Sequence, residues 1–156
     1  MPNHHFISYS RIEAKDFALR LSDDLTIGEP QVQIWLDVRD IPAGVNWDDA
    51  IDEAIKTCET LIFIMTPDSV RAESQCKNEW AWALRYKKPV VPLLCDPSAE
   101  APFRLYSRQR IDCTGDCLPP CFTLSMIRSC ERVSNILPMA TSPQESSSAS
   151  CTGGQI

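Results

Sequence analysis

The stretch that decides the fold begins with Leu61-Ile-Phe-Ile-Met65 and continues, after a mainly polar segment, with Ser74-Gln-Cys-Lys-Asn-Glu-Trp-Ala-Trp-Ala-Leu84. The first run is continuously apolar, which is typical of a strand covered by helices on both faces of its sheet. The second run has helical period, because Cys76, Trp80 and Ala83 share one side of a helix wound at about 100° per residue. A strand followed by such a helix predicts one unit of an α/β fold.

The same alternation of strand and helix patterns runs along the chain as far as about residue 112. It selects an open parallel sheet with right-handed crossovers. We expect about five strands in the doubly wound order 2-1-3-4-5, with helices on both faces. Asn46 is the expected N-cap of the second helix. The predicted strands are residues 6–9, 32–36, 61–65 and 90–94 with a fifth within 103–112, and the helical stripes span residues 14–25, 47–58 and 74–86.

Length and charge restrict the classes of protein and partner. A chain of 156 residues is long enough for one domain with a substantial core. Its net charge of −6 leaves no basic surface to neutralise phosphates, so no nucleic-acid partner is expected. The sequence opens without the pattern of a secretory signal, and its longest apolar run is too short to cross a bilayer. We therefore expect a cytoplasmic protein without a membrane partner.

Several common sites are not supported by any residue pattern. The sequence contains neither a Gly-x-Gly-x-x-Gly motif nor a Walker loop, which argues against a Rossmann dinucleotide cradle and a P-loop. The only histidines, His4 and His5, are expected as exposed residues at the start of the first strand. They do not favour a Ser-His-Asp triad or a metal site.

The eight cysteines are expected to be reduced rather than paired in disulfides. Cys58, Cys76 and Cys95 lie in apolar periodic segments, where a free cysteine behaves as a small hydrophobe. A four-residue spacing without a Cys-x-x-Cys pair or a nearby histidine does not favour a metal site. That spacing is shared by Cys113, Cys117 and Cys121.

Glu79 places a carboxylate at the edge of a buried helical stripe. By helical geometry it lies next to Ala83 and Tyr86 rather than on the far polar side. A partly desolvated carboxylate costs free energy unless hydrogen bonds or a ligand compensate. The alternative is an edge residue that reaches solvent or pairs with Arg85 or Lys87.

A ligand crevice is expected at one edge of the sheet. In doubly wound sheets it lies beyond the carboxyl ends of the strands, where the strand order reverses. Under the expected order, the stretch Ser8-Tyr9-Ser10-Arg11 and the dipeptide Thr66-Pro67 form its edges, and Glu79 leans into it. A polar loop over residues 37–47 lies between the second strand and the second helix, and Asp37 is expected as a turn residue. Trp47 at the end of this loop either packs in the core or stacks on a base.

Five blocks of residues stand in order over about residues 4–116. They are Phe6-Ile-Ser-Tyr-Ser10, Ile34-Trp-Leu-Asp37 with Ile41-x-x-Gly44-x-x-Trp47, Leu61-Ile-Phe-Ile-Met-Thr66 with Ser74-x-Cys76-x-x-Glu79, Lys88-Pro-Val-Val-Pro-Leu-Leu94, and Arg108-Gln-Arg-Ile-Asp112. Together they resemble Toll/interleukin-1 receptor (TIR) domains, and the third block resembles the bacterial-type, NAD+-cleaving branch. The resemblance implies a flavodoxin-like parallel sheet, in agreement with the alternation of strands and helices.

The resemblance implies two activities. Many TIR domains cleave NAD+ at the nicotinamide–ribose bond, and some cyclise the product, whereas others are adaptors without enzymatic activity that act by homotypic assembly. In the first group Glu79 matches the catalytic position, NAD+ is the substrate, and neither a cofactor nor a metal is needed. A role in immune or defence signalling is also implied. The residues expected to bind the substrate are Ser8, Tyr9, Ser10, Arg11, Trp47 and Cys76.

Some of these residues have a second interpretation. Arg11 either binds the pyrophosphate or forms a surface ion pair with Glu13 or Asp16. Ser8 and Tyr9 serve the substrate or simply pack at the end of a strand. The loop expected to contact a neighbouring subunit comprises Asp37, Arg39, Asp40, Ile41, Pro42 and Gly44.

The resemblance ends near residue 116. We expect a TIR domain over residues 1–116 and an atypical tail over 117–156, with at most one short helix and mainly disorder after residue 138. A sensing or oligomerising module, which usually accompanies TIR domains, is not found in the chain and is expected as a partner. A receiver-like domain is a third interpretation, but the acidic pocket it requires is absent from the sequence.

Overall fold

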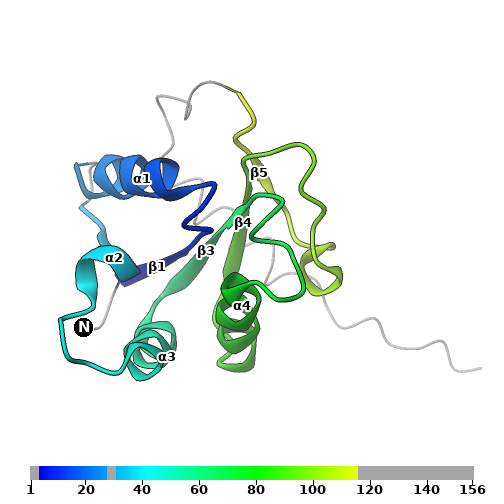
Figure 1. Ribbon diagram of the computed structural model, residues 1–156. Helices are drawn as coiled ribbons and strands as arrows, with labels where there is room; N and C mark the ends of the chain where they lie inside the picture. Colours follow the sequence, from blue (N-terminus) through cyan, green and yellow to red (C-terminus); the bar gives the residue numbers. More distant parts are fainter. Residues whose placement is uncertain (1–3, 28–30, 116–156) are drawn as a thin grey trace, which may run out of the picture.

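Five parallel strands form one sheet in the computed structural model, which describes residues 4–27 and 31–115 (Figure 1). The strands are β1 (His4–Ser8), β2 (Gln33–Trp35), β3 (Thr60–Met65), β4 (Val90–Leu94) and β5 (Ile111–Asp112). Their order is β2-β1-β3-β4-β5, which confirms the predicted doubly wound arrangement. Ile62 of β3 pairs with Ile7 of β1 on one side and with Val91 of β4 on the other.

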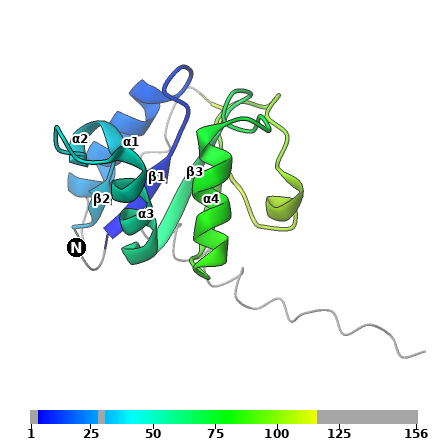
Figure 2. The same ribbon diagram turned by 60° about the horizontal axis from the view of Figure 1, so that its bottom comes forward.

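Helices cover both faces of the sheet, as predicted. They are α1 (Lys15–Ile27), the one-turn α2 (Asp37–Asp40), α3 (Trp47–Thr57) and α4 (Gln75–Arg85), with a 3-10 helix η1 (Phe103–Leu105). Helix α1 packs on one face, whereas α3 and α4 lie side by side on the other (Figures 1 and 2). The Asn46 side chain accepts a hydrogen bond from the Asp48 amide at 3.2 Å, which confirms Asn46 as the N-cap of α3.

The two hydrophobic clusters meet on β3, whose side chains alternate between the faces of the sheet. Ile62 and Ile64 pack into the cluster beneath α1, and Phe63 packs into the cluster beneath α3 and α4. None of these three side chains has any solvent exposure. Burying a side chain of this size contributes about 1.5–3 kcal/mol. Strand β3 therefore holds both helical layers on one sheet.

The prediction that His4 and His5 are exposed is wrong. Both belong to β1 and are only 4% and 3% exposed. The strand begins earlier than its apolar run because His4 pairs with Gln33 of β2, while His5 pairs with Thr60 of β3. His4 Nε2 also lies 2.9 Å from the carbonyl oxygen of Ala54. Strand pairing on both sides thus covers two polar residues that no apolar pattern marks.

The fifth strand is much shorter than the segment in which it was expected. Only Ile111 and Asp112 pair with β4. The segment begins instead with η1, in which the Leu105 amide donates to the carbonyl of Pro102 at 2.8 Å. Leu105 is fully buried, while Phe103 is almost entirely exposed. One buried anchor followed by exposed residues favours a tight turn over an extended strand.

The polar loop after β2 opens with an element that the sequence did not predict. Asp37, expected as a turn residue, is the first residue of α2. The turn closes because the Asp40 carboxylate accepts a hydrogen bond from the Leu36 amide at 2.6 Å. Residues 42–47 of the loop are exposed, and Gly44 adopts a φ of +89°, a conformation that favours glycine.

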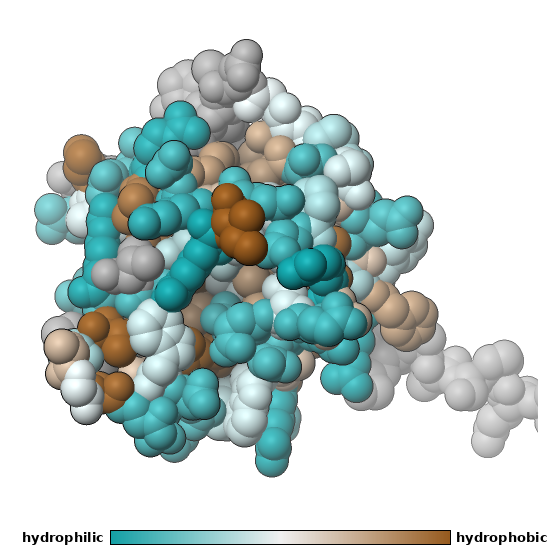
Figure 3. Space-filling model, in the orientation of Figure 1, coloured by the Kyte–Doolittle hydropathy of each residue, from teal (hydrophilic) through white to brown (hydrophobic). Residues whose placement is uncertain are grey.

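The tail expected over residues 117–156, including its short helix and its disorder, lies outside the described residues. Within residues 4–27 and 31–115, no helix is long and apolar enough to cross a membrane. The face of the molecule drawn in Figure 3 is largely hydrophilic, with small separate hydrophobic patches.

Candidate active site

Glu79 lies on α4, on the side that faces the end of β1. Helix α4 begins where the Ser74 hydroxyl accepts a hydrogen bond from the Cys76 amide at 3.2 Å. One turn later, Trp80 and Ala83 anchor the helix in the cluster beneath α3 and α4. Glu79 sits beside this stripe and is only 7% exposed, so it is buried more deeply than an edge residue.

Ser8, the last residue of β1, is the hydrogen-bond partner of Glu79. Its Oγ donates to Glu79 Oε2 at 2.5 Å, and the Ser8 side chain has no solvent exposure. Burial raises the pKa of Glu79 to about 8, and the nearby negative charge of Asp37 acts in the same direction. The hydrogen bond from Ser8 and the charge of Arg11 oppose this rise in the pKa. Glu79 is therefore a carboxyl group that is largely protonated at neutral pH.

Asp37 gathers two side chains from the segment that follows β1. Its Oδ1 accepts a hydrogen bond from the Tyr9 hydroxyl at 2.7 Å. Its Oδ2 accepts two more from Arg11, from Nε at 2.9 Å and from Nη2 at 2.6 Å. The alternative ion pair of Arg11 with Glu13 or Asp16 is therefore not the one observed. Burial of Tyr9 and its hydrogen bond to Asp37 raise the pKa of Tyr9. Its hydroxyl group therefore stays protonated and acts as a donor.

Trp47 is not a core residue. It is 39% exposed, and the Arg11 guanidinium carbon lies 4.2 Å from the centroid of its ring. A cation at this distance is attracted to the face of an indole. Arg11 thus joins Asp37, at the start of the polar loop, to Trp47 at its end.

Ser10 and Cys76 complete the surroundings of Glu79. Ser10 Oγ donates to Asp68 at 2.6 Å, and Asp68 pairs with Arg71 at 2.6 Å, which ties the loop after β1 to the loop after β3. Cys76 is 2% exposed. Burial is the main cause that raises the pKa of its thiol to about 12, and the nearby charge of Glu79 adds to the rise. A protonated thiol is a poor nucleophile, so Cys76 shapes the site rather than attacking a substrate.

A cleft of about 390 Å³ opens among these side chains, a volume within the usual range for small-molecule sites. The structure brings together most of the residues predicted to bind a substrate, and Ser8 lies behind Glu79. Four further charged residues line the cleft: Asp48, Asp68, Arg71 and Glu73. The predicted residues that line the cleft are Tyr9, Ser10, Arg11, Trp47, Cys76 and Glu79, with Asp37 from the assembly loop.

The remaining residues of the predicted assembly loop lie outside the cleft. Arg39 pairs with Asp23 of α1 at 2.9 Å, and Asp40 closes the turn of α2. Pro42 and Gly44 are exposed, and Ile41 is partly buried against the cluster beneath α3 and α4.

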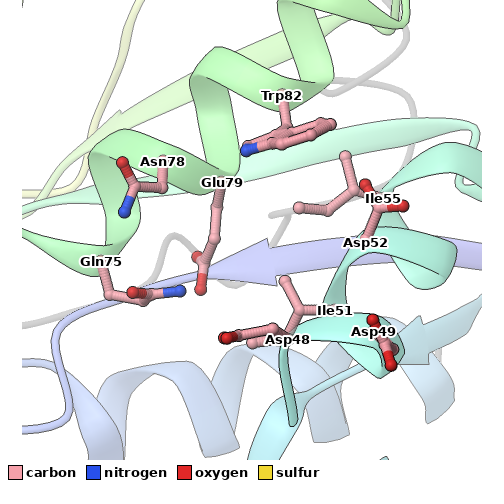
Figure 4. A pocket seen from close by; sticks show the side chains of 9 residues that line it. All are labelled: Asp48, Asp49, Ile51, Asp52, Ile55, Gln75, Asn78, Glu79 and Trp82. Carbon is pink, nitrogen blue, oxygen red and sulfur yellow. The ribbon is translucent and has the colours of Figure 1, made fainter. Parts of the chain in front are cut away.

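A second cavity, of about 530 Å³, lies between α3 and α4 (Figure 4). It shares Asp48, Gln75 and Glu79 with the cleft, so the Glu79 carboxyl group stands where the two cavities meet. Apart from Glu79, the sequence analysis did not single out the α4 side chains that line this cavity. The spacing of Gln75, Asn78, Glu79 and Trp82, at i, i+3, i+4 and i+7, is the signal that marks them as one helical face.

Comparison with known proteins agrees with this architecture. The TIR domain family model matches residues 6–120. The chain belongs to the TIR family. The crystal structure of the TIR domain of the Toll-related receptor TRR-2 from Hydra magnipapillata is similar at a TM-score of 0.54 and 18% identity, over 85% of this chain and 94% of that one.

A second solved structure shares the fold of this TIR domain. The TIR domains of the activated Roq1 resistosome, described as directly recognising the pathogen effector XopQ, are similar at a TM-score of 0.53 and 18% identity. The match covers 62% of this chain and 60% of that chain. A search of curated proteins found no significant match. The TIR family includes both NAD+-cleaving enzymes and adaptors, so the site itself must distinguish the two.

Proposed function

We propose that this TIR domain cleaves NAD+ at the nicotinamide–ribose bond, with Glu79 as the catalytic residue. The observation that supports the proposal is a carboxyl group 7% exposed, lining a cleft and held by one hydrogen bond from the end of β1. Carboxylates are rarely buried without a compensating partner, and perturbed carboxyl groups in clefts are frequent at catalytic sites.

The proposed chemistry needs no metal or cofactor. Breaking the bond develops positive charge on the ribose, and a carboxylate beside the anomeric carbon stabilises that charge. Nicotinamide leaves as a neutral molecule, so no strong general acid is required. Glu79 acts in its ionised form, which the positive charge of the substrate favours over the protonated resting form. Water or a second atom of the nucleotide then captures the ribosyl cation, giving ADP-ribose or a cyclic isomer.

Arg11 and Arg71 are the cations of the cleft, and we assign the pyrophosphate to them. Arg11 is already paired with Asp37, so the phosphates share its guanidinium or replace Asp37 as its partner. The exposed face of Trp47 offers a stacking surface for a base beside Arg11. Tyr9 and Ser10 line the same cleft, and their hydroxyl groups are held by Asp37 and Asp68.

Self-association is the second part of the proposal. The loop from Ile41 to Trp47 is largely exposed and includes Val45, an apolar side chain with 49% exposure. Arg11 contacts Trp47 at the end of this loop and Asp37 in α2, which precedes it, so a neighbouring subunit that moves the loop also moves Arg11. We expect activity to depend on assembly, driven by a sensor or oligomerising partner. A defence role is proposed on the likeness to the family.

The test is release of nicotinamide from NAD+, followed by chromatography, with the chain fused to an oligomerising coiled coil. Glu79→Ala should keep its fold and lose roughly a hundredfold or more in rate, the scale for removing an electrostatic partner of a transition state. Glu100→Ala, which removes an exposed acid, is the matched control and should leave the rate unchanged.

The adaptor is the competing function, and the exposed loop is the observation that favours it. If the fused wild-type chain releases no nicotinamide while it assembles, the enzymatic proposal fails and the adaptor remains. If the Glu79→Ala and wild-type chains release nicotinamide at equal rates, only the assignment of Glu79 as the catalytic residue is rejected.

A further inference from the structure

Two cysteines follow the ends of β4 and β5, which are neighbours in the sheet (Figure 1). Leu94, the last residue of β4, pairs with Asp112, the last residue of β5, and the next residues are Cys95 and Cys113. The Cys113 amide donates to the carbonyl of Leu94 at 2.7 Å, and the Cys95 amide donates to the carbonyl of Met65 at 3.1 Å. Because the strand hydrogen bonds continue in this way, the two cysteines lie opposite each other in the same register.

The two cysteine side chains also project from the same face of the sheet. Leu93 and Ile111 are paired residues, and both pack into the cluster beneath α1. Side chains alternate along a strand, so Cys95 and Cys113, two positions further on, belong to the same cluster. Neighbouring strands lie about 4.8 Å apart, and the Cα atoms of a disulfide usually lie about 4.4–6.8 Å apart. The pair therefore meets the spacing that a disulfide requires.

The two thiols interact directly and differ in their ionisation. The four cysteines within residues 4–27 and 31–115 are free, so this pair is a dithiol. A hydrogen bond between the two side chains raises the pKa of Cys95 and lowers the pKa of Cys113. Since a thiolate is the form that attacks an oxidant, Cys113 is the sulfur that reacts first. Cys113 is only 5% exposed, whereas Cys95 is half-buried, so the reagent must be small.

The other two described cysteines have different surroundings. Cys58 and Cys76 lie on the opposite face of the sheet, in the cluster beneath α3 and α4. Burial is the main cause that raises the pKa of Cys58 to about 11 and that of Cys76 to about 12. Both thiols are therefore protonated at neutral pH, and they serve as internal controls for the reactivity of the pair.

We propose that Cys95 and Cys113 form a redox site, at which hydrogen peroxide converts the dithiol to a disulfide that joins β4 to β5. The Cys113 thiolate attacks one oxygen of the peroxide, the O–O bond breaks, and the hydroxide that leaves takes up the proton of the original thiol. The Cys95 sulfur then attacks the sulfenic acid formed on Cys113. The S–O bond breaks, and hydroxide leaves with the proton of Cys95. The two sulfurs lose two electrons, which the peroxide gains as it becomes two molecules of water.

Oxidation acts where the sheet is held by few backbone pairs. Strand β5 pairs with β4 through two residues, and the new link closes the segment from Cys95 to Cys113, which contains η1. Closing a segment of chain reduces the entropy of the unfolded state. The oxidised protein should therefore unfold at a higher temperature than the reduced protein. Dithiothreitol should reverse the change by thiol–disulfide exchange. The inference does not depend on cleavage of NAD+.

The test maps the disulfides of folded, full-length protein after treatment with hydrogen peroxide. Remaining thiols are alkylated in denaturant, and the peptides are identified by tandem mass spectrometry. The expected product is a peptide containing Cys95 crosslinked to one containing Cys113. Fragment spectra must place the link at Cys113, because Cys117 and Cys121 belong to the same tryptic peptide.

Two substitutions separate the pair from the other thiols. Cys95→Ser should abolish the crosslink and leave a sulfenic acid on Cys113, which dimedone traps. Cys58→Ser is the matched control and should leave the crosslink unchanged. Wild-type protein in urea is a second control, which does not depend on the folding of a variant. Without paired strands, the crosslink should form at least about tenfold more slowly, because the two sulfurs are no longer held together.

Three results would overturn the redox site. The first is folded protein in which peroxide leaves both Cys95 and Cys113 free to be alkylated. The second is a disulfide that joins Cys113 to a cysteine other than Cys95. The third is an equal rate of crosslinking in the folded protein and in urea, which would show that the register of β4 and β5 plays no part.

Discussion

At the scale of single residues, the site depends on the protonation state of Glu79. Burial favours the neutral carboxyl group, and the hydrogen bond from Ser8 favours the carboxylate. Burial has the larger effect, so the pKa rises from 4.5 to about 8. The folded protein therefore holds a proton on Glu79 at pH values where the unfolded chain has lost it. This difference can be measured.

The first consequence concerns stability. Below pH 4.5 the carboxyl group of Glu79 is protonated in both the folded and the unfolded chain. Folding therefore does not have to bury a charged carboxylate. Between pH 4.5 and about 8 the unfolded chain ionises first, so the free energy of unfolding falls as pH rises, by up to about 1.4 kcal/mol per pH unit. Glu79→Gln removes this dependence. Urea unfolding of both proteins across this range should show the variant gaining stability relative to wild type, and parallel curves would contradict the raised pKa.

The second consequence concerns activity. Removing the Ser8 hydroxyl takes away a group that lowers the pKa of Glu79. In a plot of rate against pH, Ser8→Ala should therefore shift the rising part of the curve to higher pH. At neutral pH the variant should react more slowly. Ser22→Ala, a change at an equally buried serine on α1, is the control and should not move the profile. A Ser8→Ala profile that is lowered without a shift would show that Ser8 serves only packing.

At the scale of elements, the strand order was predictable and the strand ends were not. Four apolar runs and three helical stripes predicted a parallel sheet with right-handed crossovers, and the order was expected as a common one among doubly wound sheets rather than read from the periodicity. The burial of His4 and His5 was not predicted, because pairing with β2 and β3 buries them without an apolar pattern in the sequence. Pro102 and Leu105 turned the start of the expected fifth strand into η1.

The candidate site shows the same division between local and long-range information. Helical period placed Glu79 at the edge of a buried face, which is a local property. Its bond to Ser8 joins residues 71 positions apart, and the pairing of Arg11 with Asp37 joins residues 26 apart. The ion pair considered for Arg11, as the alternative to a pyrophosphate, was with Glu13 or Asp16, because helical and sequence patterns identify only nearby partners.

The loop after α2 carries a prediction at this scale. Gly44 has a φ of +89°, and an added Cβ would meet nothing within 4 Å. Gly44→Ala therefore costs backbone strain alone, about 1–2 kcal/mol in the free energy of unfolding. Gly115→Ala, at a glycine without positive φ and with equally open surroundings, should change stability by less. Chemical denaturation checks both, and equal effects would contradict the strained loop conformation.

At the scale of the whole molecule, one carboxyl group lies where two cavities meet. The sheet places Ser8 behind Glu79, α3 and α4 enclose one cavity, and the segments after β1 and β3 supply the two arginines of the cleft. The exposed loop from Ile41 to Trp47 adjoins the cleft through Trp47. In the proposed function, assembly and catalysis are thus linked through side chains that contact each other.

The most direct measurement is the rate of nicotinamide release from NAD+ by the coiled-coil fusion, for wild type and Glu79→Gln, from acid to alkaline pH. We predict that the wild-type rate rises with pH as Glu79 ionises. The glutamine variant should assemble and fold normally, yet run roughly a hundredfold or more slower at the wild-type optimum. A folded, assembled Glu79→Gln protein that releases nicotinamide at the wild-type rate would contradict the central claim.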